Sequence, residues 1–257
     1  MSVRLSQKGA CLIVHNTDEK RGVLTPQLYE AITGAIQKAE SPEIRAVILT
    51  GGAFFCAGGD LNRLKTAHEL APAERRVWIE QLHDVIRAMN QSPVPLIAAV
   101  EGGAAGAGLS LVVACDLIVA ASDAVFTAAY VNAGLTPDGG LTHALGQMMP
   151  RQMAMEMCLL GRGISAKRLA EVGMINVLCA PGQALQEALV LGEAMARGPG
   201  QAQSRIRRLL NDARAKTLET QLDHEAMFMI EAQGSDEAAE GMAAFLEKRP
   251  ARFAEPG

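Results

Sequence analysis

Hydrophobic residues in the first two thirds of this chain form short, wholly apolar runs, and those in the last third follow helical spacing. The segments AVILTGG (46–52) and PLIAAVEGG (95–103) are continuous apolar runs that end in glycine. Such runs are typical of parallel strands that are buried on both faces. DLIVAAS (116–122) and AVFTA (124–128) predict two shorter strands, and residues 1–16 predict a β-hairpin.

Helical patterns lie between these strands. Thr25-Pro26 predicts a helix start, with Thr25 as the N-cap and Pro26 in the first turn of a helix that reaches about Glu40. Residues 73–90 and 104–115 predict two more helices. Strands that alternate with helices imply βαβ units with right-handed crossovers, so the fold class is α/β with a parallel sheet.

The strand signal almost disappears after residue 139, and only MINVLCA (174–180) reads as extended. The long stretches 182–216 and 218–248 read as helices. The sequence therefore predicts an α/β core over residues 1–190 and a helical C-terminal region over 191–257. One small sheet offers too little surface to bury that region, so we expect it to pack on a neighbouring subunit.

Composition narrows the class of protein. The 257 residues are 49% apolar and 20% charged, with a formal net charge of -4. Because the basic residues are scattered, we expect no nucleic-acid or membrane partner. The five cysteines show no metal-binding spacing, and the first residues resemble no secretory leader, so we expect reduced thiols, no metal and a cytoplasmic location.

Two glycine-rich turns follow the two buried strands. The first is Gly51-Gly52-Ala53-Phe54-Phe55-Cys56-Ala57-Gly58-Gly59-Asp60-Leu61, and the second is Glu101-Gly102-Gly103-Ala104-Ala105-Gly106-Ala107-Gly108. Ligands of parallel α/β folds bind at the carboxyl ends of strands, and N–H groups in the first turn of a helix have no internal partner. Two such turns can supply two donors to one developing oxyanion, although tight packing or phosphate binding would use the same residues.

Several motifs in order resemble the crotonase, or enoyl-CoA hydratase/isomerase, superfamily. They are NTDEKRGVLT (16–25), FCAGGDL (55–61), PLIAAVEGGAAGAGLSLVVACDLIVAA (95–121), FTAAYVNAGLTPDGGLTHAL (126–145), SAKRLAEVGMINVL (165–178) and FLEKRPARF (245–253). The resemblance implies a spiral of ββα turns whose C-terminal helices form trimers, often paired as hexamers. It also implies an acyl-CoA thioester as substrate, held as an enolate, with no cofactor besides the CoA that the substrate carries.

The resemblance also assigns binding roles. The oxyanion donors would be the amides of Ala57 and Ala107. The remaining residues would line the acyl-CoA path, contact the CoA phosphates or meet a neighbouring subunit; they are Lys20, Arg21, Cys56, Gly58, Gly59, Asp60, Leu61, Gly106, Ser110, Tyr130, Lys248 and Phe253. A structural filler is the favoured interpretation of the Cys56 thiol itself.

The acid–base residue is where this chain departs from the hydratases it resembles. They carry two catalytic glutamates, and the matching positions here are Ser110 and Tyr130. A tyrosine is a poor base at neutral pH, which disfavours hydration by two carboxylates. GLTPDGG (134–140) resembles the stretch of Δ3,Δ2-enoyl-CoA and 1,2-epoxyphenylacetyl-CoA isomerases that holds the catalytic aspartate, so Asp138 is the predicted acid–base.

Other interpretations stay open at this point. Pro-Asp-Gly is also an ordinary turn, in which Asp138 would cap a helix that begins near Gly139. The enzyme could be a hydratase or hydrolase in which Asp138 or Tyr130 positions a water. A member that binds acyl-CoA without catalysis is the third possibility. The sequence gives no role for His143 and no reason for a glutamate at position 101.

Overall fold

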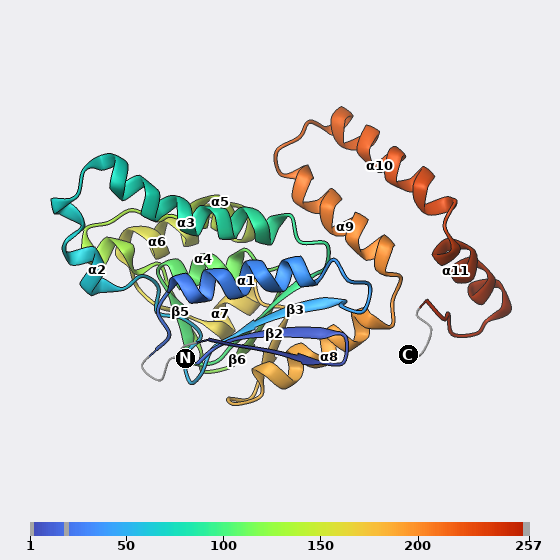
Figure 1. The fold of residues 1–257 in the computed structure, drawn as a ribbon, viewed down its shortest axis with the longest axis horizontal. Helices are drawn as coiled ribbons and strands as arrows, with labels where there is room; N and C mark the ends of the chain where they lie inside the picture. Colours follow the sequence, from blue (N-terminus) through green and yellow to red (C-terminus); the bar gives the residue numbers. More distant parts are fainter. Residues whose placement is uncertain (1–2, 18–20, 254–257) are drawn as a thin grey trace.

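The computed structural model describes residues 3–17 and 21–253, which form an α/β core with a helical extension (Figure 1). The main sheet has the order β1-β2-β3-β4-β6-β9, in which only the β1–β2 pair is antiparallel. Its strands are β1 (Val3–Lys8), β2 (Cys11–Asn16), β3 (Ala46–Thr50), β4 (Leu96–Val100), β6 (Leu117–Ala121) and β9 (Val177–Cys179). The predicted hairpin and the parallel sheet are therefore confirmed.

A second, smaller sheet includes part of the second glycine turn and has the order β5-β7-β8. Its strands are β5 (Gly103–Ala105), β7 (Val125–Thr127) and β8 (Ile164–Ser165). The predicted helix over 104–115 was wrong at its start, because Gly103–Ala105 pairs with β7. The Gly106 amide also donates to the Thr127 carbonyl, so the helix begins only at Ala107.

Helices cover both faces of the main sheet. Those of the core are α1 (Pro26–Lys38), α2 (Leu61–Lys65), α3 (Pro72–Asn90), α4 (Ala107–Val113), α5 (Leu141–Met148), α6 (Arg151–Leu160) and α7 (Ala166–Glu171), with 3-10 turns at η1 (Ala67–Glu69) and η2 (Ala129–Ala133). The N-terminus of α1 is as predicted, since the Thr25 side chain accepts the Leu28 amide and Pro26 follows.

The core is divided by the sheet into two apolar layers. All residues of β3 and β4 are buried, with alternate side chains on opposite faces. The larger layer packs against α1, α3 and α4, and the smaller against α8 (Ala184–Ala196). Figure 1 shows α1 and α3 above the sheet and α8 below it. Among the described helices, none is long and apolar enough to cross a membrane.

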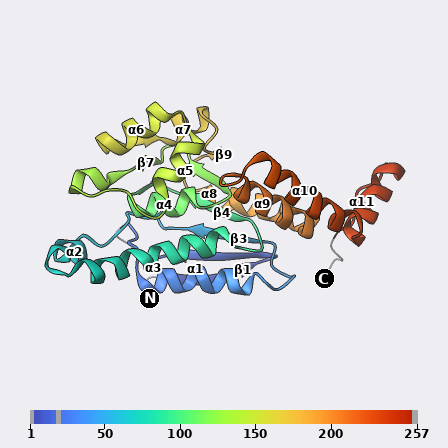
Figure 2. The ribbon, with the colours of Figure 1, turned by 90° about the horizontal axis from the view of Figure 1, so that it is seen from above.

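The C-terminal helices leave the core after α8. They are α9 (Gly200–Ala213), α10 (Leu218–Gln233) and α11 (Asp236–Glu247), and Figure 2 shows them extending away from the sheet. The predicted boundary at residue 190 falls inside α8, which packs on the sheet through Ala184, Ala188 and Leu189. The two long predicted helices are each broken once, at Gly198-Pro199 and at Gly234-Ser235, since proline cannot continue a helix and Ser235 caps the next one.

Arg207 fixes α9 to the core. Its buried guanidinium donates to Asp116 Oδ2 over 2.7 Å and to the carbonyl of Met89 over 2.6 Å, and its Nη1 donates to the carbonyls of Asn90 and Ser92. The carbonyls of Met89 and Asn90 are the last two of α3, where the helix dipole favours a cation, and Ser92 follows the helix. One side chain with four acceptors therefore makes the largest polar contribution to the attachment of α9, beside single hydrogen bonds at Asn211 and Gln203.

Candidate active site

The two glycine-rich turns lie against each other, as the sequence predicted. The Ala105 amide donates to the Cys56 carbonyl over 2.9 Å, and Cys56 and Ala104 form a parallel bridge. Gly58 has a φ of 95°, and a Cβ there would lie 2.8 Å from the Ala105 oxygen and 3.1 Å from the Ala107 nitrogen. Only glycine fits so close to the second turn, and this contact brings the first turn to the Ala107 amide.

The structure corrects one of the two predicted oxyanion donors. The Ala57 amide donates to the carbonyls of Arg21 and Gly22, over 3.0 and 2.7 Å, so it is already used by the main chain. The Ala107 amide opens α4 and, like the amide of Gly59, has no acceptor among residues 3–17 and 21–253. Gly59 is also partly exposed, so its amide replaces that of Ala57 as the candidate donor of the first turn.

Asp138 is joined by hydrogen bonds to Tyr130 and Ser110, two of the predicted site residues. The Tyr130 hydroxyl donates to Asp138 Oδ1 over 2.7 Å, and the Ser110 hydroxyl lies 3.1 Å from the same Tyr130 oxygen. Ser110 Oγ also donates to the Asp138 carbonyl over 3.0 Å. Ser110 follows Ala107 by one turn of α4, about 4.5 Å along the helix axis. The carboxylate is thus tied, through two hydroxyls, to the helix that begins with the free amide.

The segment that carries Asp138 is a tight loop rather than a helix cap. The N-cap position of α5 is Gly140, and the Asp138 main-chain carbonyl accepts the Leu141 amide. The alternative in which the Asp138 side chain caps this helix is therefore not what the structure shows. A Cβ on Gly139 would lie 2.9 Å from Ser110 Cβ and 3.0 Å from Leu82 Cδ2, so the loop is pressed onto α4 and α3.

Burial keeps the phenols around the carboxylate neutral. Burial, followed by the negative charge of Asp138, raises the pKa of Tyr130 far above its ordinary value. The same two effects and the charge of Cys56 raise the pKa of Tyr29 to about 12, with Arg63 opposing them. Tyr130 therefore stays a hydrogen-bond donor to Asp138 at neutral pH. Tyr29 on α1 stands close enough to feel the same carboxylate, and sequence reasoning had missed it.

The other residues of the first turn have mixed positions. The Asp60 side chain accepts the Asn62 amide and caps α2, which gives it a structural role at least, and Leu61 is 70% exposed. Cys56 is buried, and its carbonyl supports the second turn. The Arg21 guanidinium lies over the ring of Phe54 in the first glycine turn, 5.3 Å from the ring centre, and Arg21 is exposed. Lys20 lies outside the described residues.

Lys248 and Phe253 lie far from these turns within one chain. Lys248 ends α11 in a left-handed conformation with a φ of 54°, and the Phe253 ring packs near Gly241 of the same helix. Figures 1 and 2 both place α11 at the opposite end of the molecule from α2. Of the two predicted roles, contact with the CoA of the same chain is therefore not supported by this arrangement.

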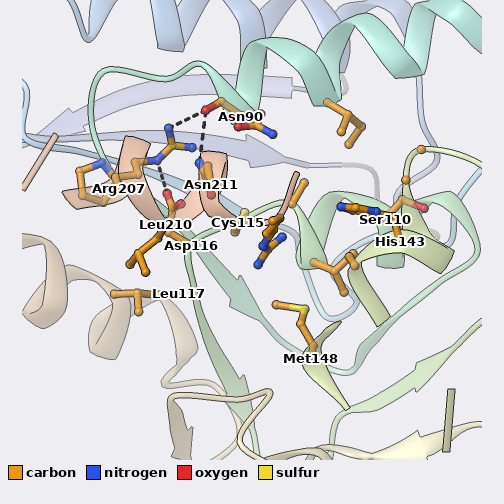
Figure 3. Close-up of a pocket in the computed structure, with 18 of the residues that line it drawn as sticks. Asn90, Ser110, Cys115, Asp116, Leu117, His143, Met148, Arg207, Leu210 and Asn211 are labelled. Atoms are coloured by element: carbon orange, nitrogen blue, oxygen red, sulfur yellow. Dashed lines mark hydrogen bonds and ion pairs between the residues drawn. The ribbon is translucent and has the colours of Figure 1, made fainter. Parts of the chain in front are cut away.

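A cavity of about 480 Å³ runs from the Ser110 cluster toward α9. Figure 3 shows Ser110 and His143 at one end and Arg207 and Leu210 at the other. The wall is mostly apolar and comes from α3, α4, α5 and α9; it includes Ile86, Val113, Ala144, Met148, Ile206 and Leu210. His143, which the sequence left without a role, is exposed and lines this cavity. The part of the wall from α9 had no signal in the sequence, because α9 is distant in the chain.

Comparison with known proteins places this geometry in a family. A family model described as enoyl-CoA hydratase/isomerase matches residues 6–256. The 1,2-epoxyphenylacetyl-CoA isomerase of Escherichia coli is 33% identical over 96% of this chain and 95% of its own length. A probable enoyl-CoA hydratase of Rhodobacter capsulatus has the same identity over 96% of this chain and 95% of its own.

Solved structures agree with this assignment. The crystal structure of an enoyl-CoA hydratase from Polaromonas sp. JS666 has a TM-score of 0.94 and 41% identity, over 98% of this chain and 99% of that one. A second, from Geobacillus kaustophilus, has a TM-score of 0.92 and 31% identity, over 99% and 98% of the two chains. These matches show that the chain, which has two paired glycine turns, a free amide and a spiral α/β core, belongs to the enoyl-CoA hydratase/isomerase, or crotonase, family of acyl-CoA enzymes.

Proposed function

We propose that this enzyme is an enoyl-CoA isomerase that uses Asp138 as a single acid–base. The carboxylate would remove a proton from C2 of a 3-enoyl thioester and return it to C4. In the intervening dienolate the negative charge resides largely on the thioester oxygen, which the amides of Ala107 and Gly59 would hold. The observation that carries this proposal is that one carboxylate, Asp138, is tied through the Tyr130 and Ser110 hydroxyls to α4, the helix that begins with the free Ala107 amide.

Tyr130 and Ser110 favour proton transfer over hydration. Two-carboxylate hydration needs a second base that can activate water, and a phenol with a raised pKa and a serine hydroxyl cannot replace it. The Tyr130 hydroxyl donates to Asp138 Oδ1, which leaves Oδ2 for the substrate proton. The hydroxyls would then orient the carboxylate, which moves one proton between two carbons of one substrate.

The cavity beside Ser110 would receive the distal part of the acyl group. Ser110 and Gly139 belong both to the cavity wall and to the cluster around Asp138, so an acyl chain extending past the carboxylate would enter it. A volume of about 480 Å³ is in the range of ligand pockets, and the wall is largely apolar. Arg21, exposed beside the first glycine turn, would contact the CoA phosphates, with Lys20 as a second cation.

We further propose a homotrimer, or a dimer of trimers, assembled through α10 and α11. Phe245 and Leu246 are 84% and 80% exposed, and Leu218 and Ile230 are each 71% exposed. Such an apolar surface is typical of a protein interface. Lys248 and Phe253 at the end of α11 would then meet the CoA site of a neighbouring subunit. Sedimentation of the wild-type protein that shows only monomer would contradict this assembly.

Replacing Asp138 with asparagine tests the proposed mechanism. Asparagine keeps the acceptor for the Tyr130 hydroxyl but cannot accept the substrate proton, so we expect kcat to fall by about 10²–10⁴ with little change in melting temperature. Asp123→Asn, on an exposed turn, is the matched control and should keep full activity. Turnover of a 3-enoyl-CoA is followed by the absorbance of the conjugated product, and mass spectrometry verifies that no water has been added. Full activity in Asp138→Asn would remove this residue from the mechanism.

Hydration is the second candidate, because the hydroxyls of Ser110 and Tyr130 and the Asp138 carboxylate form a polar cluster that could hold a water. The same assay separates the two reactions. An isomerase returns a product with the mass of its substrate, whereas hydration of a 2-enoyl-CoA adds one water. Tight binding of acyl-CoA without either product, for straight, branched and aromatic acyl groups, would favour the non-catalytic alternative.

A further inference from the structure

Glu101 occupies the junction between the second glycine turn and α8, and neither end of it is free. Its main-chain carbonyl accepts the amides of Gly103, over 2.6 Å, and Phe55, over 3.1 Å. Its carboxylate accepts the amides of Gly182, over 2.9 Å, and Ala184, over 2.8 Å. One residue therefore joins the first turn, the second turn and the start of α8.

The bonds to α8 are of the strong kind. A carboxylate at a helix N-terminus accepts charge-assisted hydrogen bonds and faces the positive end of the helix dipole. The opposite end of α8 is also held, because Arg45 donates to the carbonyls of Met195 and Gly198. Between these ends, Ala184, Ala188 and Leu189 pack on the sheet. Helix α8 is thus a fixed support, and Glu101 is its link to the glycine turns.

A short chain of main-chain contacts connects Glu101 to the candidate donors. The Phe55 amide, which is shared between the carbonyls of Glu101 and Gly103, is one residue before Cys56, and the Cys56 carbonyl accepts the Ala105 amide. Two residues beyond Ala105 is Ala107, whose nitrogen lies against Gly58. The Glu101 backbone therefore belongs to the hydrogen-bonded chain that links the two turns. Oxyanion stabilisation requires donors held within a few tenths of an ångström of the developing charge.

We propose that Glu101 is a positioning residue, whose carboxylate anchors the second glycine turn to α8 and so sets the distance between the Ala107 and Gly59 amides. This inference rests on the proposed oxyanion role of those two amides. Glu101 itself does not touch the substrate. Its effect is on the thioester oxygen, where negative charge develops, and not on the affinity for the CoA moiety.

Glu101→Gln and a matched control test the proposal. Glutamine is nearly isosteric but neutral; its one carbonyl oxygen can accept only one of the two amides, and its NH2 group is a donor that cannot accept the other. The control is Glu237→Gln, because the Glu237 carboxylate accepts the amides of Gln201 and Ala202 at the N-terminus of α9, away from the glycine turns. Both variants should lose a similar amount of thermal stability. Only Glu101→Gln should lower kcat, by about tenfold with KM changed less than twofold.

Acetoacetyl-CoA gives a second readout that needs no turnover. Its thioester ionises to an enolate with its own ultraviolet band, so the enolate fraction of the bound ligand at fixed pH reports how well the two amides hold an oxyanion. We expect this fraction to rise on binding to wild type and to Glu237→Gln. In Glu101→Gln we expect the increase in the enolate fraction to be about one tenth of the wild-type increase, with unchanged affinity for the ligand. Should Glu101→Gln fail to fold, Glu101→Asp keeps the charge with a shorter reach and should give an intermediate loss.

The outcomes separate this inference from the proposed function. If Glu101→Gln loses stability as Glu237→Gln does, while kcat and the enolate fraction stay at wild-type values, Glu101 is a helix cap only and the inference is overturned. If wild type does not increase the enolate fraction, or a variant that lacks the Gly59 amide remains fully active, the oxyanion role itself fails. A selective loss in Glu101→Gln supports the inference.

Discussion

The α/β core and the C-terminal helices differ in how far their apolar side chains are exposed. In the core, every residue of β3 and β4 is buried, and large side chains such as Phe126 and Leu145 are fully enclosed. On α10 and α11, Ile230, Phe245 and Leu246 are more than 70% exposed. The core is therefore complete within one chain and holds the candidate site, whereas the helices present a surface that this chain alone does not cover.

The difference shows where each region obtains its stability. Burial of apolar surface contributes about 25 cal/mol per Å², so the core gains most of its stabilisation from its own packing. Helices that leave their apolar faces in water gain little by folding alone. Among the described residues that link the two regions, Arg207 donates to the largest number of acceptors in the core. We expect changes in the core to affect catalysis, changes at Arg207 to affect stability, and changes on α11 to affect assembly.

After Asp138→Asn, removal of the Gly59 amide should have the largest effect on activity. Gly59→Pro deletes that N–H without adding a charge, and removal of one oxyanion donor typically lowers kcat by about 10²–10³. We expect a loss of this size with acyl-CoA binding retained, measured by steady-state kinetics and calorimetry. Circular dichroism and the melting temperature verify the fold. Activity within threefold of wild type in a folded variant would contradict the assignment of Gly59.

Arg207→Met should cause the largest loss of stability. Methionine fills much of the same volume but leaves Asp116 and three carbonyls without their buried cation, and breaking a buried ion pair typically costs about 3–5 kcal/mol. Chemical denaturation measures the free energy of unfolding. Arg168→Met, which removes an exposed pair with Glu171, is the control and should cost less than about 1 kcal/mol. Equal losses in both variants would mean that Arg207 does not fix α9.

Serine in place of Phe245 and Leu246 should separate assembly from folding. Both side chains are exposed on α11, so we expect the free energy of unfolding of the monomer to change by only about 0.5 kcal/mol. Light scattering coupled to size-exclusion chromatography should show a shift from oligomer to monomer. Leu61→Ser, at an exposed position of the core, should leave the assembly intact. An unchanged mass in the double variant would exclude this part of α11 from the interface.

The smallest expected effect is a pH dependence within the C-terminal region. Hydrogen bonds from Arg249, then from the Arg252 amide, lower the pKa of Glu240 from its ordinary 4.5 to about 2. A carboxyl whose folded pKa is depressed stabilises the fold above its unfolded pKa, and this contribution is lost as pH falls from about 4.5 through about 2. Glu240→Gln should therefore lower the melting temperature slightly at pH 7 and have a diminishing effect toward pH 2. A difference that does not vary with pH would point to another cause.

The periodicity of the sequence was sufficient for the elements of the core. Continuous apolar runs such as 46–50 predict buried strands, because local composition and burial agree there. The helix start at Thr25-Pro26 was predictable for the same local reason. Family resemblance added the motif positions of Ser110, Tyr130 and Asp138, which the structure joins by hydrogen bonds.

The tertiary structure alone decided which groups of the site are free. Residues 21 and 22 cross the first glycine turn and occupy the Ala57 amide, and no local pattern at positions 55–61 reveals that contact. The same holds for Tyr29 beside Asp138, for the cavity wall from α9 and for Glu101 at the start of α8. Local sequence determines which backbone conformations are low in free energy. Which donors and carboxylates are left for a ligand depends on segments distant in the chain, because hydrogen bonds are satisfied across the whole fold.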